Sequence, residues 1–152
     1  MTLNLLLGLM LMMPQAIANQ IPKNNPNGVW QAESGSKYNI HLSGDDLKVT
    51  IVPNSNPKFL QYEVNLTLLG AHDKEYKDDP NTYKGPGFFV AKMEGGKECK
   101  VDIEWQVTVV QPGLILGSAT NAIVDSKTCD VRDKSQVQLS LKRAASPQGA
   151  RQ

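Results

Sequence analysis

The sequence predicts an all-β fold, an eight-stranded antiparallel meander that closes into a small barrel. Two observations predict this class. Apolar and polar residues alternate in several segments, which is the period of strands with one buried and one solvated face. Short segments rich in Gly, Pro, Asn and Asp separate these runs, as expected for hairpin turns. A sandwich of two sheets is the alternative architecture for the same strands.

Each strand is predicted from its own alternation and from the turn that follows it. The clearest is 98–110, where Cys, Val, Ile and Trp alternate with Lys, Asp, Glu and Gln. Sequential strands that short turns connect pair most simply with their chain neighbours, and closing the sheet removes its exposed edges. The eight predicted strands are 29–34, 37–43, 46–52, 59–69, 87–93, 98–110, 114–124 and 135–143.

The longest connection is the segment 70–86, which contains one His, four acidic residues and two Tyr. Long loops on a rigid scaffold often carry recognition, so we expect this one to gate the mouth of the barrel. Its acidic residues do not match the spacing of a calcium-binding EF-hand loop. No metal site is therefore expected in this segment.

The N-terminus has the features of a secretory signal. Residues 5–13 form an uncharged apolar run, Pro14 ends it, and the small residues at 16 and 18 suit a signal peptidase. A transmembrane helix needs about 20 apolar residues, roughly twice this run. We expect a secreted or periplasmic protein whose mature chain has no membrane span. The predicted division is a signal peptide at 1–18, a flexible leader at 19–27, the barrel domain at 28–143 and a disordered tail at 144–152.

The two cysteines, Cys99 and Cys129, fit such a destination. In an oxidising compartment an even number of cysteines favours a disulfide, although two buried thiols are the alternative. A metal site is less well supported, because there is no C-x-x-C pattern and both histidines are distant in sequence. We therefore expect a disulfide, and neither a metal nor a cofactor.

Composition limits the partners and the chemistry. The chain has 152 residues with 16 Lys and Arg against 15 Asp and Glu, which gives no electrostatic argument for nucleic acid. There is no Gly-rich phosphate loop and no G-x-S-x-G nucleophile pattern. Carboxylates such as Glu63 and Asp102 lie on polar strand positions, where we expect them to be solvated. The prediction is a binding protein and not an enzyme.

One motif carries a family resemblance. A G-x-W sequence at 28–30 opens the first predicted strand, and Lys142 and Arg143 end the last one. This pattern resembles that of the lipocalins and the wider calycin superfamily. In those barrels the Trp packs near one end, under a basic residue from the last strand. The resemblance implies a ligand-binding barrel of the calycin kind and does not identify a ligand.

Inward-facing aromatic residues are the candidate ligand contacts. An eight-stranded barrel has room either for its own side chains or for one small ligand, and an apolar interior would bind a hydrophobic or aromatic molecule. The predicted contacts are Trp30, Tyr62, Phe88 and Trp105. Four small residues are expected to leave space inside, namely Gly87, Ala91, Gly117 and Ala119.

The sequence also leaves an alternative function open. With a filled core, the chain would be an envelope or extracellular protein-interaction or structural module. Phe88 and Phe89 are adjacent, so a regular strand turns them to opposite faces and leaves one of them outside. Together with Tyr83, this Phe would form a small apolar patch for a protein partner.

Overall fold

The computed structural model describes residues 24–145, and the structural statements below refer to this part of the chain. The expected signal peptide at 1–18, the first part of the expected leader (19–23) and most of the expected tail (146–152) lie outside the described residues.

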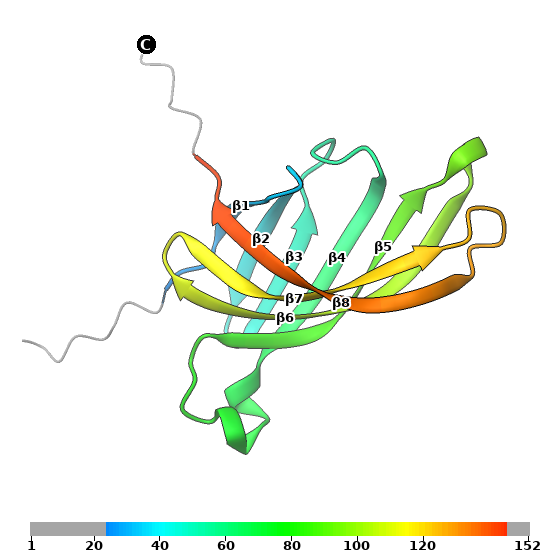
Figure 1. Cartoon of the computed structure of the whole chain (residues 1–152). Helices are drawn as coiled ribbons and strands as arrows, with labels where there is room; N and C mark the ends of the chain where they lie inside the picture. The colour runs from blue at the N-terminus through cyan, green and yellow to red at the C-terminus, as the bar shows by residue number, and fades with distance from the viewer. Residues whose placement is uncertain (1–23, 146–152) are drawn as a thin grey trace, which may run out of the picture.

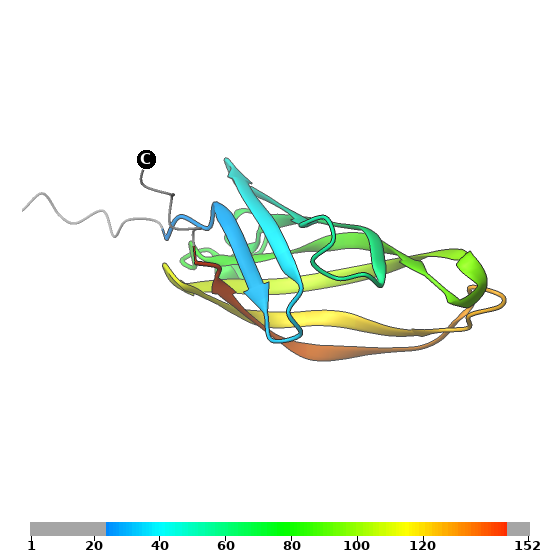
Figure 2. The same cartoon turned by 90° about the horizontal axis from the view of Figure 1, so that it is seen from above.

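Eight antiparallel strands follow one another around a closed barrel in chain order, so the predicted fold class is confirmed (Figure 1 and Figure 2). The barrel, and not the sandwich, is the architecture adopted. The strands are β1 (Gly28–Ala32), β2 (Lys37–Ser43), β3 (Asp46–Ile51), β4 (Phe59–Leu68), β5 (Thr82–Lys92), β6 (Glu98–Gln111), β7 (Leu114–Val124) and β8 (Val131–Arg143).

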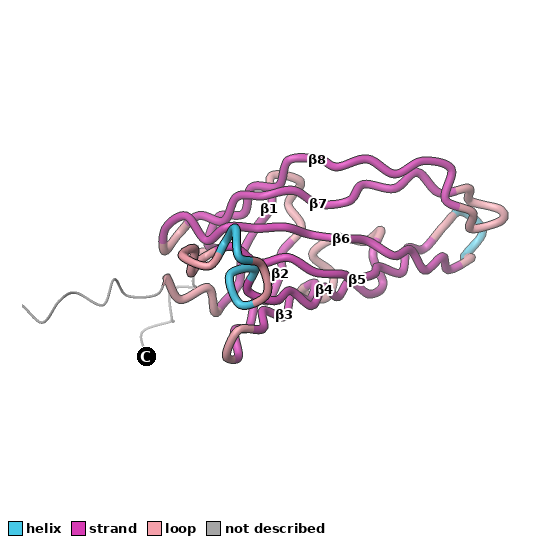
Figure 3. The backbone as a smooth tube through the Cα atoms, turned by 90° about the horizontal axis from the view of Figure 1, so that it is seen from below, coloured by secondary structure: helices cyan, strands magenta, loops and turns pink. Residues whose placement is uncertain are grey.

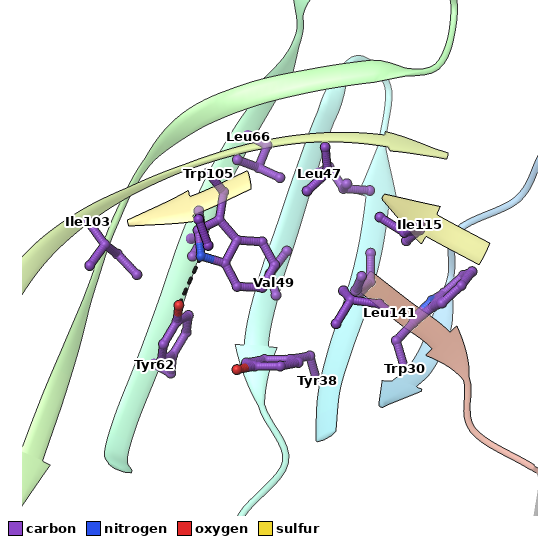
Figure 4. Packing of buried hydrophobic residues seen from close by; sticks show 14 of the residues in the cluster. Trp30, Tyr38, Leu47, Val49, Tyr62, Leu66, Ile103, Trp105, Ile115 and Leu141 are labelled. Carbon is purple, nitrogen blue, oxygen red and sulfur yellow. Dashed lines mark hydrogen bonds between the residues drawn. The ribbon is translucent and has the colours of Figure 1, made fainter. Parts of the chain in front are cut away.

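Alternation along the strands determines what the barrel encloses. In β6, every second residue from Cys99 to Val109 is buried and most of the others are exposed. The same rule places the alternate apolar residues of β2, β3 and β4 inside. One cluster of buried side chains fills the barrel from Trp30 at one end to Tyr62 and Trp105 near its middle (Figure 4).

Two strands begin several residues earlier than the sequence predicts. Residues 82–86, expected as loop, are the first part of β5, where Pro86 lies opposite Glu104 of β6. Residues 131–134 are strand as well and begin β8. The remaining connection, 69–81, contains two short 3₁₀ turns, η1 (Leu69–Ala71) and η2 (Lys74–Tyr76). A third 3₁₀ turn, η3 (Glu94–Gly96), joins β5 to β6.

The backbone pairing between β6 and β7 stops halfway. Counted from the β6–β7 turn, the last pair is Trp105 with Ala119, although both strands continue beyond it. The β5–β6 and β7–β8 hairpins each stay paired and run apart from one another (Figure 3). Side chains connect the separated strands. Thr120 Oγ1 accepts a hydrogen bond from Glu104 N at 2.9 Å, and Lys134 Nζ donates to Asp102 O at 2.9 Å.

The tips of the two hairpins are joined again by the disulfide between Cys99 and Cys129. The Cα atoms are 5.3 Å apart, so the predicted pairing of the two cysteines is confirmed. Beside it, Lys97 Nζ donates a hydrogen bond to Lys127 O of the β7–β8 connection. The disulfide therefore fixes the distance between two hairpins whose backbones no longer pair.

The barrel closes through a short seam between β1 and β8. Only three residue pairs form it, from Trp30 opposite Arg143 to Ala32 opposite Leu141. The rest of β8 pairs with β7 as far as Val131 and has no partner in β1. Among the strands of residues 24–145, none pairs with this edge of β8 over residues 131–140.

Removing the disulfide should destabilise the fold without changing its topology. Closing a loop of 30 residues stabilises by about 3.5 kcal/mol in the chain-entropy model. We expect the free energy of unfolding of the double variant Cys99→Ala/Cys129→Ala, measured in urea, to fall by about this amount. Reductant should destabilise the wild type similarly and leave the double variant unaffected. Equal stability of the two proteins without reductant would contradict this role.

Candidate ligand-binding site

A cavity of about 970 Å³ lies where the two hairpins separate. Residues of β2, β4, β5 and β6 line one side and residues of β7 and β8 line the other, with the β1–β2, β3–β4 and β5–β6 connections around its mouth. This volume is at the upper end of the range usual for small-molecule pockets. The barrel interior is thus filled at one end and hollow at the other.

One wall of the cavity is aromatic. Tyr38, Phe59, Tyr62, Phe89 and Trp105 line it, contributed by four strands. Most neighbouring rings meet edge to face, with centroids 5.4 Å apart for Tyr38 and Trp105 and 5.3 Å apart for Phe59 and Tyr62. Tyr62 and Phe89 are stacked at 6.0 Å. Such contacts hold each ring in one orientation, so the wall is rigid and preformed.

A buried hydrogen bond joins two of these rings. Trp105 Nε1 donates to the Tyr62 hydroxyl oxygen at 2.9 Å (Figure 4). Burial raises the pKa of Tyr62 well above its ordinary value, and the nearby Tyr38 raises it further, against the opposing effect of the Trp105 hydrogen bond. Burial also raises the pKa of Tyr38, with the Ser36 hydroxyl acting in the opposite direction. Both phenols are therefore neutral at physiological pH.

The opposite wall combines small and aliphatic side chains with uncharged polar ones. Its residues are Leu116, Ala119, Thr120, Asn121, Ala122 and Val124 of β7 and Val137, Gln138, Leu139 and Ser140 of β8. Of the four small residues expected to leave space, Ala91 and Ala119 do line the cavity. Gly87 and Gly117 do not. A Cβ atom on them would lie 2.3 Å from Glu63 O and 2.1 Å from Gln106 O, so their lack of a side chain admits a neighbouring strand.

The mouth of the cavity is polar. Ser34, Ser36, Asn56 and the charged residues Lys58 and Glu94 lie there. Ser36 is buried and its hydroxyl accepts a hydrogen bond from Asn56 Nδ2 at 2.8 Å, which ties the β1–β2 turn to the β3–β4 connection. Acidic and basic side chains are mixed at this mouth, so it has no strong preference for either sign of charge.

Trp30 lies at the other end of the barrel and does not line the cavity. Its indole is fully buried and donates from Nε1 to Pro26 O at 2.7 Å. The Arg143 guanidinium carbon lies 4.6 Å from the ring centroid, a cation–π contact. Trp30 is thus a plug at the closed end, and the ligand contact predicted for it is not formed at this cavity.

Arg143 holds the chain over this plug. Its guanidinium donates hydrogen bonds to three backbone carbonyls, at Pro112 (3.0 Å), Asn27 (2.7 Å) and Asn25 (2.6 Å). Gly28 has a φ of +131°, and a Cβ atom there would lie 2.8 Å from Arg143 Nη1. The G-x-W sequence and the basic residue of the last strand therefore form one local unit, and Arg143, not Lys142, is the residue over Trp30.

Phe88, the fourth predicted contact, does not line the cavity, and its neighbour Phe89 does. Lys100 Nζ lies 4.3 Å from the centroid of the Phe88 ring, so a charged side chain covers it. Phe89 and Tyr83 are both buried. The apolar surface patch proposed for these three residues in the alternative function is therefore not formed. The inward-facing positions of β5 could have been predicted from the sequence. Counting every second residue from Tyr83 through 84–87 makes Phe89 inward-facing and Phe88 outward-facing.

The connection 69–81 does not gate the cavity. None of its residues lines the cavity, and Asn81 O accepts a hydrogen bond from Val109 N near the β6–β7 turn. That turn is at the end where Pro112 contacts Arg143. The expected lid therefore lies at the closed end of the barrel, and the shorter β1–β2, β3–β4 and β5–β6 connections surround the mouth.

The other candidate chemistry is dispersed over the surface. Glu63 forms an ion pair with Lys48 at 3.3 Å, and Glu104 forms one with Lys84 at 3.5 Å. Within residues 24–145, no three His, Cys, Asp or Glu side chains are grouped so that they could hold a metal ion. No helix in this part of the chain is long and apolar enough to cross a membrane.

High pH should reveal the burial of Tyr62. In the unfolded chain its hydroxyl ionises near the ordinary pKa of 10.0, whereas the folded protein keeps it protonated. The contribution of Tyr62 to the free energy of unfolding is therefore fully present below pH 10. Above pH 10 it is lost, by up to about 1.4 kcal/mol per pH unit. We expect the free energy of unfolding, measured in urea between pH 9 and 11, to fall less steeply in Tyr62→Phe than in the wild type. Identical slopes would show that the folded state ionises Tyr62 as readily as the unfolded state does.

Replacing Arg143 tests the closed end. Lysine keeps the charge but cannot form the forked hydrogen bonds to three carbonyls, so Arg143→Lys should lower the free energy of unfolding by roughly 1–2 kcal/mol. Lys142→Ala is the matched control on the same strand, where the change should stay within about 0.5 kcal/mol. Thermal unfolding followed by circular dichroism measures both. A control variant as unstable as Arg143→Lys would argue against a specific role for Arg143.

Comparison with protein-family models, with curated proteins and with solved structures gave no match. The described residues form an eight-stranded antiparallel barrel with Trp30 beneath Arg143 at one end. These features are compatible with a lipocalin-like barrel.

Proposed function

We propose that the protein is a secreted or periplasmic binding protein that holds a small hydrophobic or aromatic ligand in the cavity of its barrel. The observation that carries this proposal is the cavity of about 970 Å³ with a rigid wall of five aromatic rings. A core that served only for stability would be filled, because empty space beside large apolar side chains costs packing energy.

The lining supports an apolar ligand and a moderate affinity. Aromatic rings and aliphatic side chains make up much of the lining, together with uncharged polar residues of β7 and β8, and the charged residues of the lining are all exposed. Burying apolar surface contributes roughly 25 cal/mol per Å², although much of this offsets the loss of ligand freedom. For a ligand of about ten non-hydrogen atoms, we expect a Kd on the order of 10–100 µM.

Two features support export. The apolar run at 5–13 followed by small residues is typical of a secretory signal, and the disulfide is typical of an oxidising compartment. The plug formed by Trp30 and Arg143 supports a relationship to the calycins, as the G-x-W resemblance implies. This relationship is part of the proposal.

One observation favours a second candidate function, a protein-interaction module. The edge of β8 from 131 to 140 lacks a partner in β1, and an unpaired strand edge can bind an extended segment of another polypeptide. Such binding uses the backbone groups of this edge, part of which lines the cavity. A bound polypeptide would therefore shift the backbone amide signals along residues 131–140, whereas a small ligand in the cavity shifts the indole signal of Trp105.

The two tryptophans allow the cavity to be tested with an internal control. Trp105 lines the cavity and Trp30 does not. We expect tetralin, a bicyclic hydrocarbon, to shift the indole Nε1–H signal of Trp105 in a saturable NMR titration and to leave that of Trp30 in place. Ala119→Phe should weaken binding at least tenfold, because the added ring occupies the cavity. Val110→Phe, at an exposed position of β6, should bind as the wild type does.

Several outcomes would overturn the proposal. Failure of tetralin to shift the Trp105 signal at concentrations up to its solubility would argue against an open apolar cavity. Equal shifts of both indole signals would indicate nonspecific binding. Unchanged affinity in Ala119→Phe would place the bound molecule elsewhere on the protein.

A further inference from the structure

Tyr62 has one hydrogen-bonding group for which the described residues supply no partner. Its hydroxyl oxygen accepts from Trp105 Nε1, and this is the only hydrogen bond of that hydroxyl within residues 24–145. A tyrosine hydroxyl also carries one proton to donate. Tyr62 as a whole residue is only 7% exposed. A buried donor of this kind needs an acceptor, because leaving it unpaired costs free energy.

The acceptor has to come from within the cavity. Tyr62 and Trp105 both line it, and the indole N–H already occupies the side of the hydroxyl that faces Trp105. The phenol proton therefore points away from the indole. A molecule that fills the cavity and excludes water from it therefore has to supply this acceptor.

We propose that the cavity selects ligands with a neutral carbonyl oxygen, which accepts a hydrogen bond from the Tyr62 hydroxyl while the rest of the molecule packs on the aromatic wall. This inference rests on the proposed function and adds a chemical requirement to it. Shape and apolar character alone then do not determine binding.

The surroundings argue for a neutral acceptor. Among the described residues, Lys58 and Lys92 are the only basic ones that line the cavity; both are exposed, and acidic residues also lie at the mouth. An anionic group at the depth of Tyr62 would have to lose its hydration without a cation to pair with. The raised pKa of Tyr62 also keeps its hydroxyl protonated, so it remains a donor. Ketones, esters and amides meet these requirements.

A matched pair of probes tests the inference. Tetralin and 1-tetralone have the same bicyclic framework and differ by one carbonyl oxygen. The ketone is better hydrated, so without a donor in the cavity it should bind more weakly than the hydrocarbon. We expect the wild type to bind 1-tetralone at least as tightly as tetralin, measured by NMR titration of the Trp105 indole signal.

Removing the Tyr62 hydroxyl should reverse this preference. In Tyr62→Phe, the affinity for 1-tetralone should fall about tenfold, in line with one hydrogen bond, while that for tetralin stays within about twofold. Tyr38→Phe is the matched control, since it removes a hydroxyl from the same wall and leaves the Trp105 hydrogen bond intact. Its ratio of ketone to hydrocarbon affinity should equal that of the wild type.

A measurement on the wild type alone keeps the test independent of any folding defect in Tyr62→Phe. The infrared carbonyl stretch of bound 1-tetralone should lie at lower frequency than in an aprotic apolar solvent, as expected for a hydrogen-bonded ketone. A stretch at the apolar-solvent frequency would overturn the inference.

The remaining outcomes separate the inference from the proposed function. If both probes bind and the hydrocarbon binds more tightly, the cavity is functional but Tyr62 does not select carbonyls. If Tyr38→Phe loses the ketone preference as strongly as Tyr62→Phe does, Tyr62 is not the selecting donor. If neither probe shifts the Trp105 signal, the proposed function itself fails.

Discussion

The end of the β6–β7 backbone ladder at Trp105 and Ala119 is the constraint on which the rest of the structure depends. Up to this pair, eight strands surround a filled core. Beyond it, two hairpins diverge, and the space between them is the cavity. Two backbone groups beyond the end of the ladder, Glu104 N and Asp102 O, are hydrogen-bonded by the side chains of Thr120 and Lys134. The opening is therefore a built feature with its own hydrogen bonds.

The two ends of the barrel differ in packing: one is filled by side chains and the other contains the cavity. At the closed end, Trp30 fills the space between strands and Arg143 donates hydrogen bonds to three carbonyls from two segments of the chain. At the open end, the rings of the aromatic wall support one another and leave room on the side of β7 and β8. Rigid support on one side and small residues on the other allow a preformed site, which avoids the cost of ordering it on binding.

The sequence predicted well which residues of most strands face the interior. It did not predict that β6 and β7 stop pairing halfway along their length. Strict alternation in β6 identified Trp105 as inward. In β5, the Gly85-Pro86-Gly87 segment has the composition of a turn, which hid the first half of the strand and led to Phe88 in place of Phe89. The cavity depends on where one ladder ends, and that is decided by contacts between β6 and β7. Local periodicity predicts which face of a strand a side chain lies on, but not which residues of other strands it contacts.

The seam between β1 and β8 has a consequence for how the molecule is assembled. The Arg143 guanidinium bonds the Asn27 carbonyl across 116 residues of chain, and only three residue pairs surround this contact. Closing so long a loop for so few contacts is entropically unfavourable until the intervening strands have formed. We therefore expect the seam to form after the intervening strands have paired, and to be the first part of the barrel to open in thermal fluctuations.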